Sequence, residues 1–247
     1  MKENRYDETI FFEKYSEMER SKKGLEGAGE WKELEKMLPA FEDRDVLDLG
    51  CGYGWHCAYA AEKGARSVLG TDISARMLEV AEQKNSHKRV RYVQCAMEDL
   101  KLEKTSFDII LSSLAFHYVK DFSALVSHIR EWIKPGGIFV FSVEHPVFTA
   151  RGDQDWHYDA QGNIQHFPVD NYYYEGKREA VFLGEKVIKY HRTLTTYMDV
   201  LLDNGFEILK VTEPMPPDEM MEIPGMKDEM RRPMMLLIKA KRKETGI

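Results

Sequence analysis

Cysteine is scarce in this sequence, and long apolar runs are missing. The three cysteines, Cys51, Cys57 and Cys95, form no Cys-x-x-Cys pair. A disulfide framework and a zinc site are therefore disfavoured, and we expect no metal centre and a reducing, cytoplasmic location. No segment approaches the roughly 18 apolar residues of a membrane-spanning helix. The first residues, Met-Lys-Glu-Asn-Arg, lack the apolar stretch of a signal peptide.

The sequence also lacks a surplus of positive charge. It has 42 Asp and Glu against 35 Lys and Arg, a net charge of -7 over 247 residues. Because phosphate contacts require excess Lys and Arg, we do not expect nucleic acid as a partner. The basic run at 239–243 is interpreted as a solvated tail rather than a binding patch. The composition leaves the oligomeric state open.

What the sequence does have is an alternation of short apolar segments with helical patterns. Five segments have the character of buried strands: 46–49, 67–71, 90–94, 107–111 and 138–143. Helical patterns cover about 55–62, 74–84 and 121–132, the second beginning at the capping residue Ser74. This alternation predicts an α/β fold with a Rossmann-like, doubly wound, mostly parallel sheet. Ligands bind such sheets at the carboxyl ends of the strands.

Two segments lie outside this alternation. Residues 1–40 are expected to form a cap of two short helices. Residues 148–190 are rich in aromatic side chains, and we interpret them as an insertion that serves as a lid or binding loop, with plain hydrophobic packing as the alternative. A helix over about 191–203 and strands over 206–212 and 234–240 complete what we expect to be one domain over residues 1–247.

A glycine-rich loop with an acid on either side follows the first strand. Glycines at 50, 52 and 54 permit positive φ angles and let the backbone approach a ligand, although such a loop can also merely pack a helix on a strand. The third glycine of a dinucleotide fingerprint is replaced by Trp55. Asp48 precedes the loop, and Asp72 follows the second strand. A carboxylate at Asp72 can accept hydrogen bonds from a ribose, or it can serve as a turn residue before Ser74.

These segments resemble, in order, five motifs of the class I S-adenosylmethionine-dependent methyltransferases, closest to the small-molecule group typified by the ubiquinone and menaquinone methyltransferases. The resemblance is strong over about 44–145. It implies a seven-stranded sheet in the order 3-2-1-4-5-7-6 with the last strand antiparallel. It also implies S-adenosylmethionine as cofactor and S-adenosylhomocysteine as product. The segments that carry it are Val46–Gly54, Leu69–Leu78, Gln94–Leu100, Phe107–Leu114 and Ile133–Gly137.

The resemblance implies cofactor contacts along these segments. Asp72 would hold the ribose, Ala96 and Met97 would lie along the adenine, and Glu98 would receive its amino group. The N-terminal segment would close over the cofactor, where Arg20 would meet the methionine carboxylate, unless that segment only covers the sheet. The complete set is Asp48, Gly50, Cys51, Gly52, Gly54, Asp72, Ile73, Met77, Ala96, Met97, Glu98, Ser112, Ser113, Tyr15, Met18 and Arg20.

Candidate catalytic groups follow the fourth and fifth strands. The methyl group of this cofactor is already activated, so the protein must align an acceptor, exclude water and, where needed, remove a proton. His117 suits a base near neutral pH, with a packing histidine as the alternative. Glu144 and His145 are further candidates. As neighbours on a strand they point to opposite faces, so both reach the pocket only if the chain turns at Pro146.

We therefore predict a methyltransferase with a small-molecule acceptor that the sequence does not identify. A nicotinamide-dependent oxidoreductase is disfavoured by Trp55 and by the motif order. A protein that binds the cofactor without transferring methyl groups remains an alternative. The segment Ser112–Ala115 differs from the Asn-Pro-Pro-Tyr type of motif, and this disfavours base or glutamine amines as acceptors.

Overall fold

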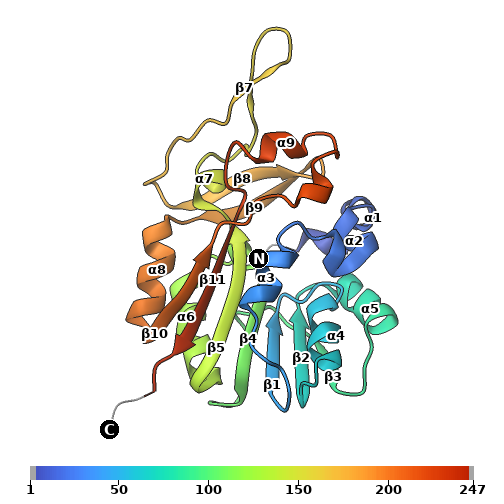
Figure 1. The fold of residues 1–247 in the computed structure, drawn as a ribbon, viewed down its shortest axis with the longest axis vertical. Helices are drawn as coiled ribbons and strands as arrows, with labels where there is room; N and C mark the ends of the chain where they lie inside the picture. Colours follow the sequence, from blue (N-terminus) through green and yellow to red (C-terminus); the bar gives the residue numbers. More distant parts are fainter. Residues whose placement is uncertain (1–3, 245–247) are drawn as a thin grey trace.

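The computed structural model describes residues 4–244 and contains a seven-stranded sheet (Figure 1). Its strands are β1 (Asp45–Leu49), β2 (Ser67–Asp72), β3 (Val90–Gln94), β4 (Phe107–Ser113), β5 (Ile133–Glu144), β10 (Phe206–Thr212) and β11 (Met235–Arg242). They lie in the order β10-β11-β5-β4-β1-β2-β3. β1 to β5 pair in parallel, whereas β11 is antiparallel to both β5 and β10. The predicted order 3-2-1-4-5-7-6 with an antiparallel last strand is confirmed.

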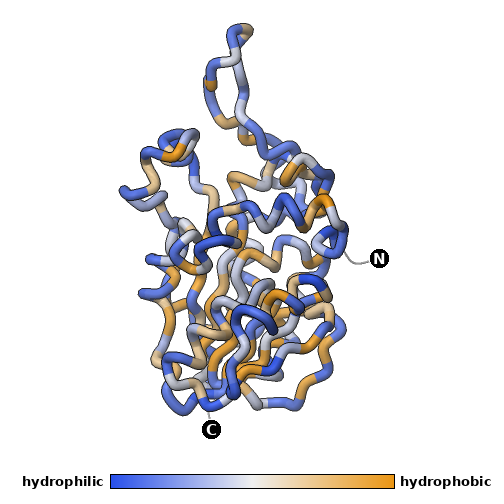
Figure 2. Tube along the Cα trace, turned by 90° about the vertical axis from the view of Figure 1, so that its right-hand side faces the viewer, coloured by the Kyte–Doolittle hydropathy of each residue, from blue (hydrophilic) through white to orange (hydrophobic). Residues whose placement is uncertain are grey.

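Helices cover both faces of this sheet. α6 (Phe122–Trp132) and α8 (Leu194–Asp203) pack with Phe139 and Phe141 of β5 in one apolar cluster. α3 (Trp31–Met37), α4 (Trp55–Glu62) and α5 (Ala75–Lys84) contribute to a second cluster, which includes Val140. Because successive strand residues point to opposite faces, the apolar run of β5 fills both cores. Figure 2 shows the hydrophobic stretches gathered in the part of the molecule that holds the sheet.

The helix starts follow their capping residues, with one correction. Ser74 Oγ accepts the Met77 N–H at 3.1 Å at the start of α5, as expected. The helix expected from residue 191 is wrong at its beginning, because β9 (Glu185–His191) extends to that residue. Val187, Lys189 and His191 are buried, and the residues between them are less buried. This two-residue alternation of burial is typical of a strand. α8 begins only at Leu194, after its capping residue Thr193.

The N-terminal segment contains more elements than the two short helices that we expected. Its described part holds η1 (Arg5–Asp7), α1 (Thr9–Ser16), α2 (Glu19–Lys23), η2 (Gly24–Gly27) and α3. The expected cap begins at residue 1, and its first three residues lie outside the described part of the chain. We call residues 4–27 the N-terminal cap.

The insertion is not one long loop. After α7 (Pro146–Thr149), β6 (His157–Tyr158) and β7 (Ile164–His166) form a hairpin that projects from the body at the top of Figure 1. β8 (Gly176–Phe182) and β9 form a second hairpin. Phe11 of α1 packs with Ala180 and Val187 of this hairpin in a third apolar cluster, so the N-terminal cap and the insertion are joined.

The remaining short helices are η3 (Phe116–Tyr118), η4 (Asp218–Met220) and α9 (Met226–Glu229). Lys239, Lys241 and Arg242 of the C-terminal basic run lie in β11 rather than in a solvated tail, which corrects that interpretation. Within residues 4–244, no helix combines the length and apolar character that crossing a membrane would need.

Candidate active site

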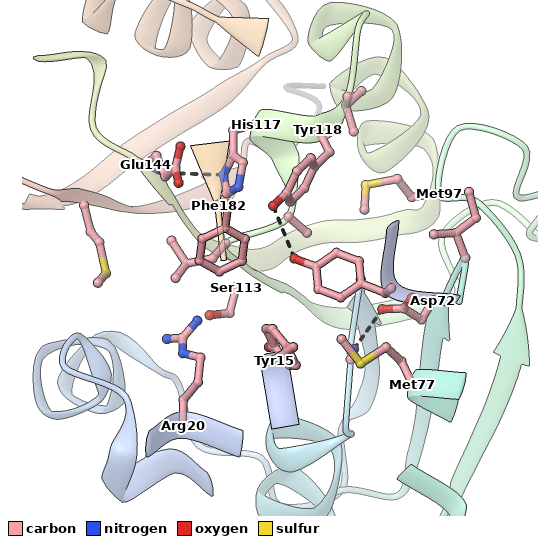
Figure 3. Close-up of a pocket in the computed structure, with 18 of the residues that line it drawn as sticks. Tyr15, Arg20, Asp72, Met77, Met97, Ser113, His117, Tyr118, Glu144 and Phe182 are labelled. Atoms are coloured by element: carbon pink, nitrogen blue, oxygen red, sulfur yellow. Dashed lines mark hydrogen bonds between the residues drawn. The ribbon is translucent and has the colours of Figure 1, made fainter. Parts of the chain in front are cut away.

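A cavity of about 260 Å³ lies at the carboxyl ends of the parallel strands (Figure 3). The loops after β1, β2, β3 and β4 and the last residue of β5 contribute to its wall, and residues of the N-terminal segment, of β8 and of the start of β11 complete it. This is the edge at which the alternation of strands and helices predicts a ligand site. Predicted site residues that line the cavity are Tyr15, Met18, Arg20, Gly50, Gly52, Asp72, Ile73, Met77, Ala96, Met97, Glu98, Ser113, His117 and Glu144.

The glycine loop brings bare backbone to this cavity. Gly50 and Gly52 have φ angles of +72° and +53°, in the left-handed region that side chains rarely adopt. A Cβ atom on Gly50 would lie 2.6 Å from the Cβ of Ala115, so no side chain fits there. The Gly50 N–H donates to the Thr71 carbonyl oxygen at 2.8 Å and holds the loop against β2.

Asp72 joins this loop to the end of β2. Its Oδ2 accepts the Gly52 N–H at 2.9 Å, and its Oδ1 accepts the Ser74 N–H at 2.8 Å. Burial raises the pKa of Asp72, and the hydrogen bonds from Ser74 and Gly52 oppose this effect. The carboxylate thus serves as a turn residue and lines the cavity at the same time, so the two interpretations of Asp72 do not exclude each other.

Three predicted cofactor residues do not line the cavity. Asp48 is buried, and its Oδ2 lies 3.3 Å from Cys57 Sγ of α4; burial raises the pKa of Asp48 to about 7. Ser112 Oγ donates to the Leu49 carbonyl oxygen at 2.8 Å. A Cβ atom on Gly54 would lie 2.2 Å from the Tyr92 hydroxyl oxygen. Asp48, Ser112 and Gly54 thus lie outside the lining of the cavity, in contact with neighbouring parts of the fold.

A second cavity of about 80 Å³ adjoins the first, and both are lined by Tyr15, Arg20, Gly50, Gly52 and Ser113. Cys51 belongs to this smaller cavity, together with Trp55. Arg20 forms an ion pair with the buried Glu30, which sequence reasoning missed. Trp55 Nε1 and Glu30 Oε2 are buried and have no hydrogen-bond partner within residues 4–244. A buried donor and a buried acceptor beside the glycine loop are therefore left unsatisfied.

The opposite end of the main cavity is formed by His117 and Tyr118 of η3, Glu144 of β5, Phe182 of β8 and Met235. The N-terminal cap reaches this end through Tyr6, whose hydroxyl lies 3.2 Å from that of Tyr118. The sequence analysis did not assign Tyr6, Tyr118, Phe182, Met234 or Met235 to the site.

His117 is buried here and Glu144 is partly buried, and the pKa of each is shifted from its ordinary value. His117 Nδ1 accepts the backbone N–H of Glu144 at 3.5 Å (Figure 3). Burial lowers the pKa of His117 to about 4, although the Glu144 carboxylate opposes this effect. Glu144 accepts hydrogen bonds from Lys189 Nζ at 2.5 Å and from Gln154 Nε2 at 2.8 Å. Burial acts to raise the pKa of Glu144, but the charges of His117 and Lys189 and these hydrogen bonds outweigh it and hold the pKa low.

His145 lies outside the cavity, which corrects its assignment as a catalytic candidate. Its Nδ1 accepts the Val147 N–H at 3.0 Å and caps α7, and its Nε2 lies 2.8 Å from Glu213 Oε1. Glu144 and His145 thus separate to opposite sides, as neighbouring residues of an extended chain do. The turn at Pro146 does not bring the imidazole to the cavity.

The chain is similar to known methyltransferases over most of its length and in its fold. Residues 47–141 match the family described as "Methyltransferase domain". A Listeria monocytogenes structure assigned as an S-adenosylmethionine-dependent methyltransferase is 54% identical, with a TM-score of 0.85, over 90% of this chain and 100% of that one. An S-adenosylmethionine-dependent methyltransferase of Mesorhizobium loti is 41% identical, with a TM-score of 0.82, over 89% and 100%.

Two sequence relatives extend these similarities. An uncharacterized protein of Haemophilus influenzae is 34% identical over 97% of both chains. A malonyl-[acyl-carrier protein] O-methyltransferase of Halalkalibacterium halodurans is 34% identical, but over only 42% of this chain and 41% of that enzyme. These comparisons do not favour a nicotinamide-dependent oxidoreductase or a non-catalytic binding protein. The chain belongs to the S-adenosylmethionine-dependent methyltransferases.

Proposed function

We propose that this methyltransferase acts on a small molecule in the cytoplasm, with the cofactor at the β1–β3 end of the main cavity and the acceptor at the β5 end. The observation that carries the proposal is the continuity of the cavity, whose wall includes Asp72 at one end and His117 and Glu144 at the other. The N-terminal cap roofs this space through Tyr6 and Tyr15. A roofed cavity of about 260 Å³ suits a small acceptor better than a folded macromolecule.

The cofactor end fits a nucleoside that carries an amino acid group. Asp72 can accept from ribose hydroxyls, and Ala96 and Met97 can flank the base. Next to the glycine loop, Glu30 Oε2 can accept from an ammonium group, and Trp55 Nε1 can donate to a carboxylate. Because Arg20 already pairs with Glu30, we assign it two roles. It holds the Glu30 side chain in place, and it contacts the carboxylate of the cofactor. When bound, S-adenosylmethionine supplies a methyl group that is activated by its sulfonium.

We further propose that the N-terminal cap and the β8–β9 hairpin act together as the lid of the site. Asp7 accepts hydrogen bonds from Ser74 Oγ at 2.6 Å and from the Arg76 N–H at 3.2 Å, which fastens the cap to the start of α5. The buried Phe11 fastens it to the hairpin. Closing both would exclude water from the transfer.

The proposal is tested by incubating the protein with S-adenosylmethionine and a library of small metabolites and measuring S-adenosylhomocysteine. We expect at least one acceptor to raise product formation above the background without acceptor. Asp72→Ala should weaken cofactor binding and lower turnover, whereas Asp108→Asn, at the amino end of the central strand β4, should retain both. Turnover with protein or RNA fractions but with no metabolite would overturn the small-molecule acceptor.

A further inference from the structure

One ring nitrogen of His117 contacts a backbone group that can only donate a hydrogen bond. The backbone N–H of Glu144 points at His117 Nδ1, and an amide nitrogen can only donate. Nδ1 therefore carries the lone pair in the neutral ring, and the proton lies on Nε2. Figure 3 shows His117 at the wall of the cavity, facing Phe182 and Tyr118.

From this contact we infer that His117 serves the methyl acceptor as a neutral hydrogen-bond donor through Nε2–H, and not as a base. This inference rests on the proposed function of the cavity. To accept a proton on Nε2, the ring would first have to move its own proton to Nδ1, where it would meet the Glu144 N–H. A protonated ring meets the same conflict, because both of its nitrogens carry hydrogen.

The charged groups around His117 agree with a neutral ring. Glu144 of β5 favours the imidazolium, but Lys189 of β9, Arg192 after β9 and Arg20 of α2 oppose it, and burial, the largest effect, also favours the neutral ring. The hydroxyls of Tyr118 and Tyr6 stand on the remaining side. The Glu144 carboxylate is occupied by Lys189 and Gln154. It is therefore a poor proton acceptor near neutral pH.

These groups define the chemistry of the acceptor. Nε2–H requires an acceptor atom with a free lone pair, and no group at this end of the described cavity is placed to take a proton. An acidic hydroxyl compound, phenol- or enol-like, whose proton is lost to water meets both conditions, and it is the acceptor class that we infer. Its ionised oxygen accepts the His117 hydrogen bond. In the transfer, an oxygen–carbon bond forms, the carbon–sulfur bond of the cofactor breaks, and the negative and positive charges cancel.

The tautomer can be measured without any acceptor. In protein labelled with ¹⁵N-histidine, the resonances of His117 are identified by their loss in His117→Gln, and nitrogen–carbon-bound-proton correlations distinguish the two ring nitrogens. We expect the proton on Nε2 and no titration between pH 6 and 8, both with and without S-adenosylhomocysteine. A proton on Nδ1, or titration in this range, would overturn the donor role.

Two variants separate donor from base once the metabolite screen yields an acceptor. Gln at position 117 can present an amide N–H near the position of Nε2 but cannot act as a base, whereas Ala can do neither. We expect His117→Gln to keep kcat/KM within about tenfold of the wild type with the same pH profile. His117→Ala should lose roughly 10- to 150-fold, the range for a hydrogen bond to a charged group.

Equal losses in the two variants, or a pH limb that disappears in His117→Gln, would show a base instead. An amine or thiol as acceptor would refute the hydroxyl class. If no metabolite is methylated, the proposed function fails, while the nitrogen resonances still decide the tautomer.

Discussion

The carboxylate of Asp72 should carry a large part of the cofactor affinity. Each of its oxygens already accepts one backbone N–H, from Gly52 at 2.9 Å and from Ser74 at 2.8 Å, and each has a further lone pair. Asp72→Ala removes a charged acceptor for the ribose and also loosens the glycine loop. Loss of one hydrogen bond to a charged group costs about 1.5–3 kcal/mol. The dissociation constant of S-adenosylhomocysteine should therefore rise about 10- to 150-fold.

Calorimetric titration with S-adenosylhomocysteine measures this loss, and Asp108→Asn is the matched control. Asp108 Oδ2 also accepts a backbone N–H, from Asp45 at 2.9 Å. Asp108 lies near the start of β4, however, at the amino ends of the strands and away from the cavity. Its substitution should lower the melting temperature and leave the affinity unchanged. Wild-type affinity in a folded Asp72→Ala protein would refute the assignment of the ribose to this carboxylate.

Three further substitutions test the glycine loop, the lid and the amino end of β1. Gly50→Ala should abolish binding of S-adenosylhomocysteine in titrations. The new Cβ would lie 2.6 Å from that of Ala115, and the φ of +72° adds about 1–2 kcal/mol of strain. Wild-type affinity would refute the close packing of Gly50 against Ala115. Phe11→Ala should raise the dissociation rate of S-adenosylhomocysteine, and it should increase hydrogen exchange in α1 and in the β8–β9 hairpin together. Increased exchange in α1 alone would contradict the proposal that the two parts act as one lid. Hydrogen bonds from Arg66 and its positive charge lower the pKa of Asp45, so its stabilising contribution is present above the unfolded pKa of about 3.9 and is lost as the pH falls below it. Asp45→Asn should accordingly lower the free energy of unfolding in urea by about 1 kcal/mol at pH 7 and by less near pH 3, and equal losses at both pH values would contradict this pairing.

Local sequence signals were sufficient for the sheet and for the cofactor end of the cavity. The apolar strands, the capping Ser74 and the glycine spacing each depend on residues close together in the chain. Asp48 was misassigned although the period of the strand held the answer. Val46 and Asp48 share one face of β1, and that face packs against α4, so the acid meets Cys57 rather than the cavity.

The acceptor end could not be predicted in the same way, because it is assembled by contacts between distant segments. Tyr6 meets Tyr118 over 112 positions, and Lys189 meets Glu144 over 45. No local pattern marks either pair. The aromatic content of residues 148–190 did indicate an element near the site, but only the pairing of β8 with β9 places Phe182 at the cavity.

The ion pairs of the site explain why its two ends can differ in chemistry. Arg20 pairs with Glu30 on the cofactor side, and Lys189 pairs with Glu144 on the acceptor side, so each buried charge is balanced within the chain. Burying an unpaired charge costs several kcal/mol, and breaking either pair would therefore leave a strong local field in the cavity. The acceptor then meets mainly apolar walls and neutral donors. An acceptor bound at this end would be selected by shape and by its hydrogen bond to the neutral ring of His117.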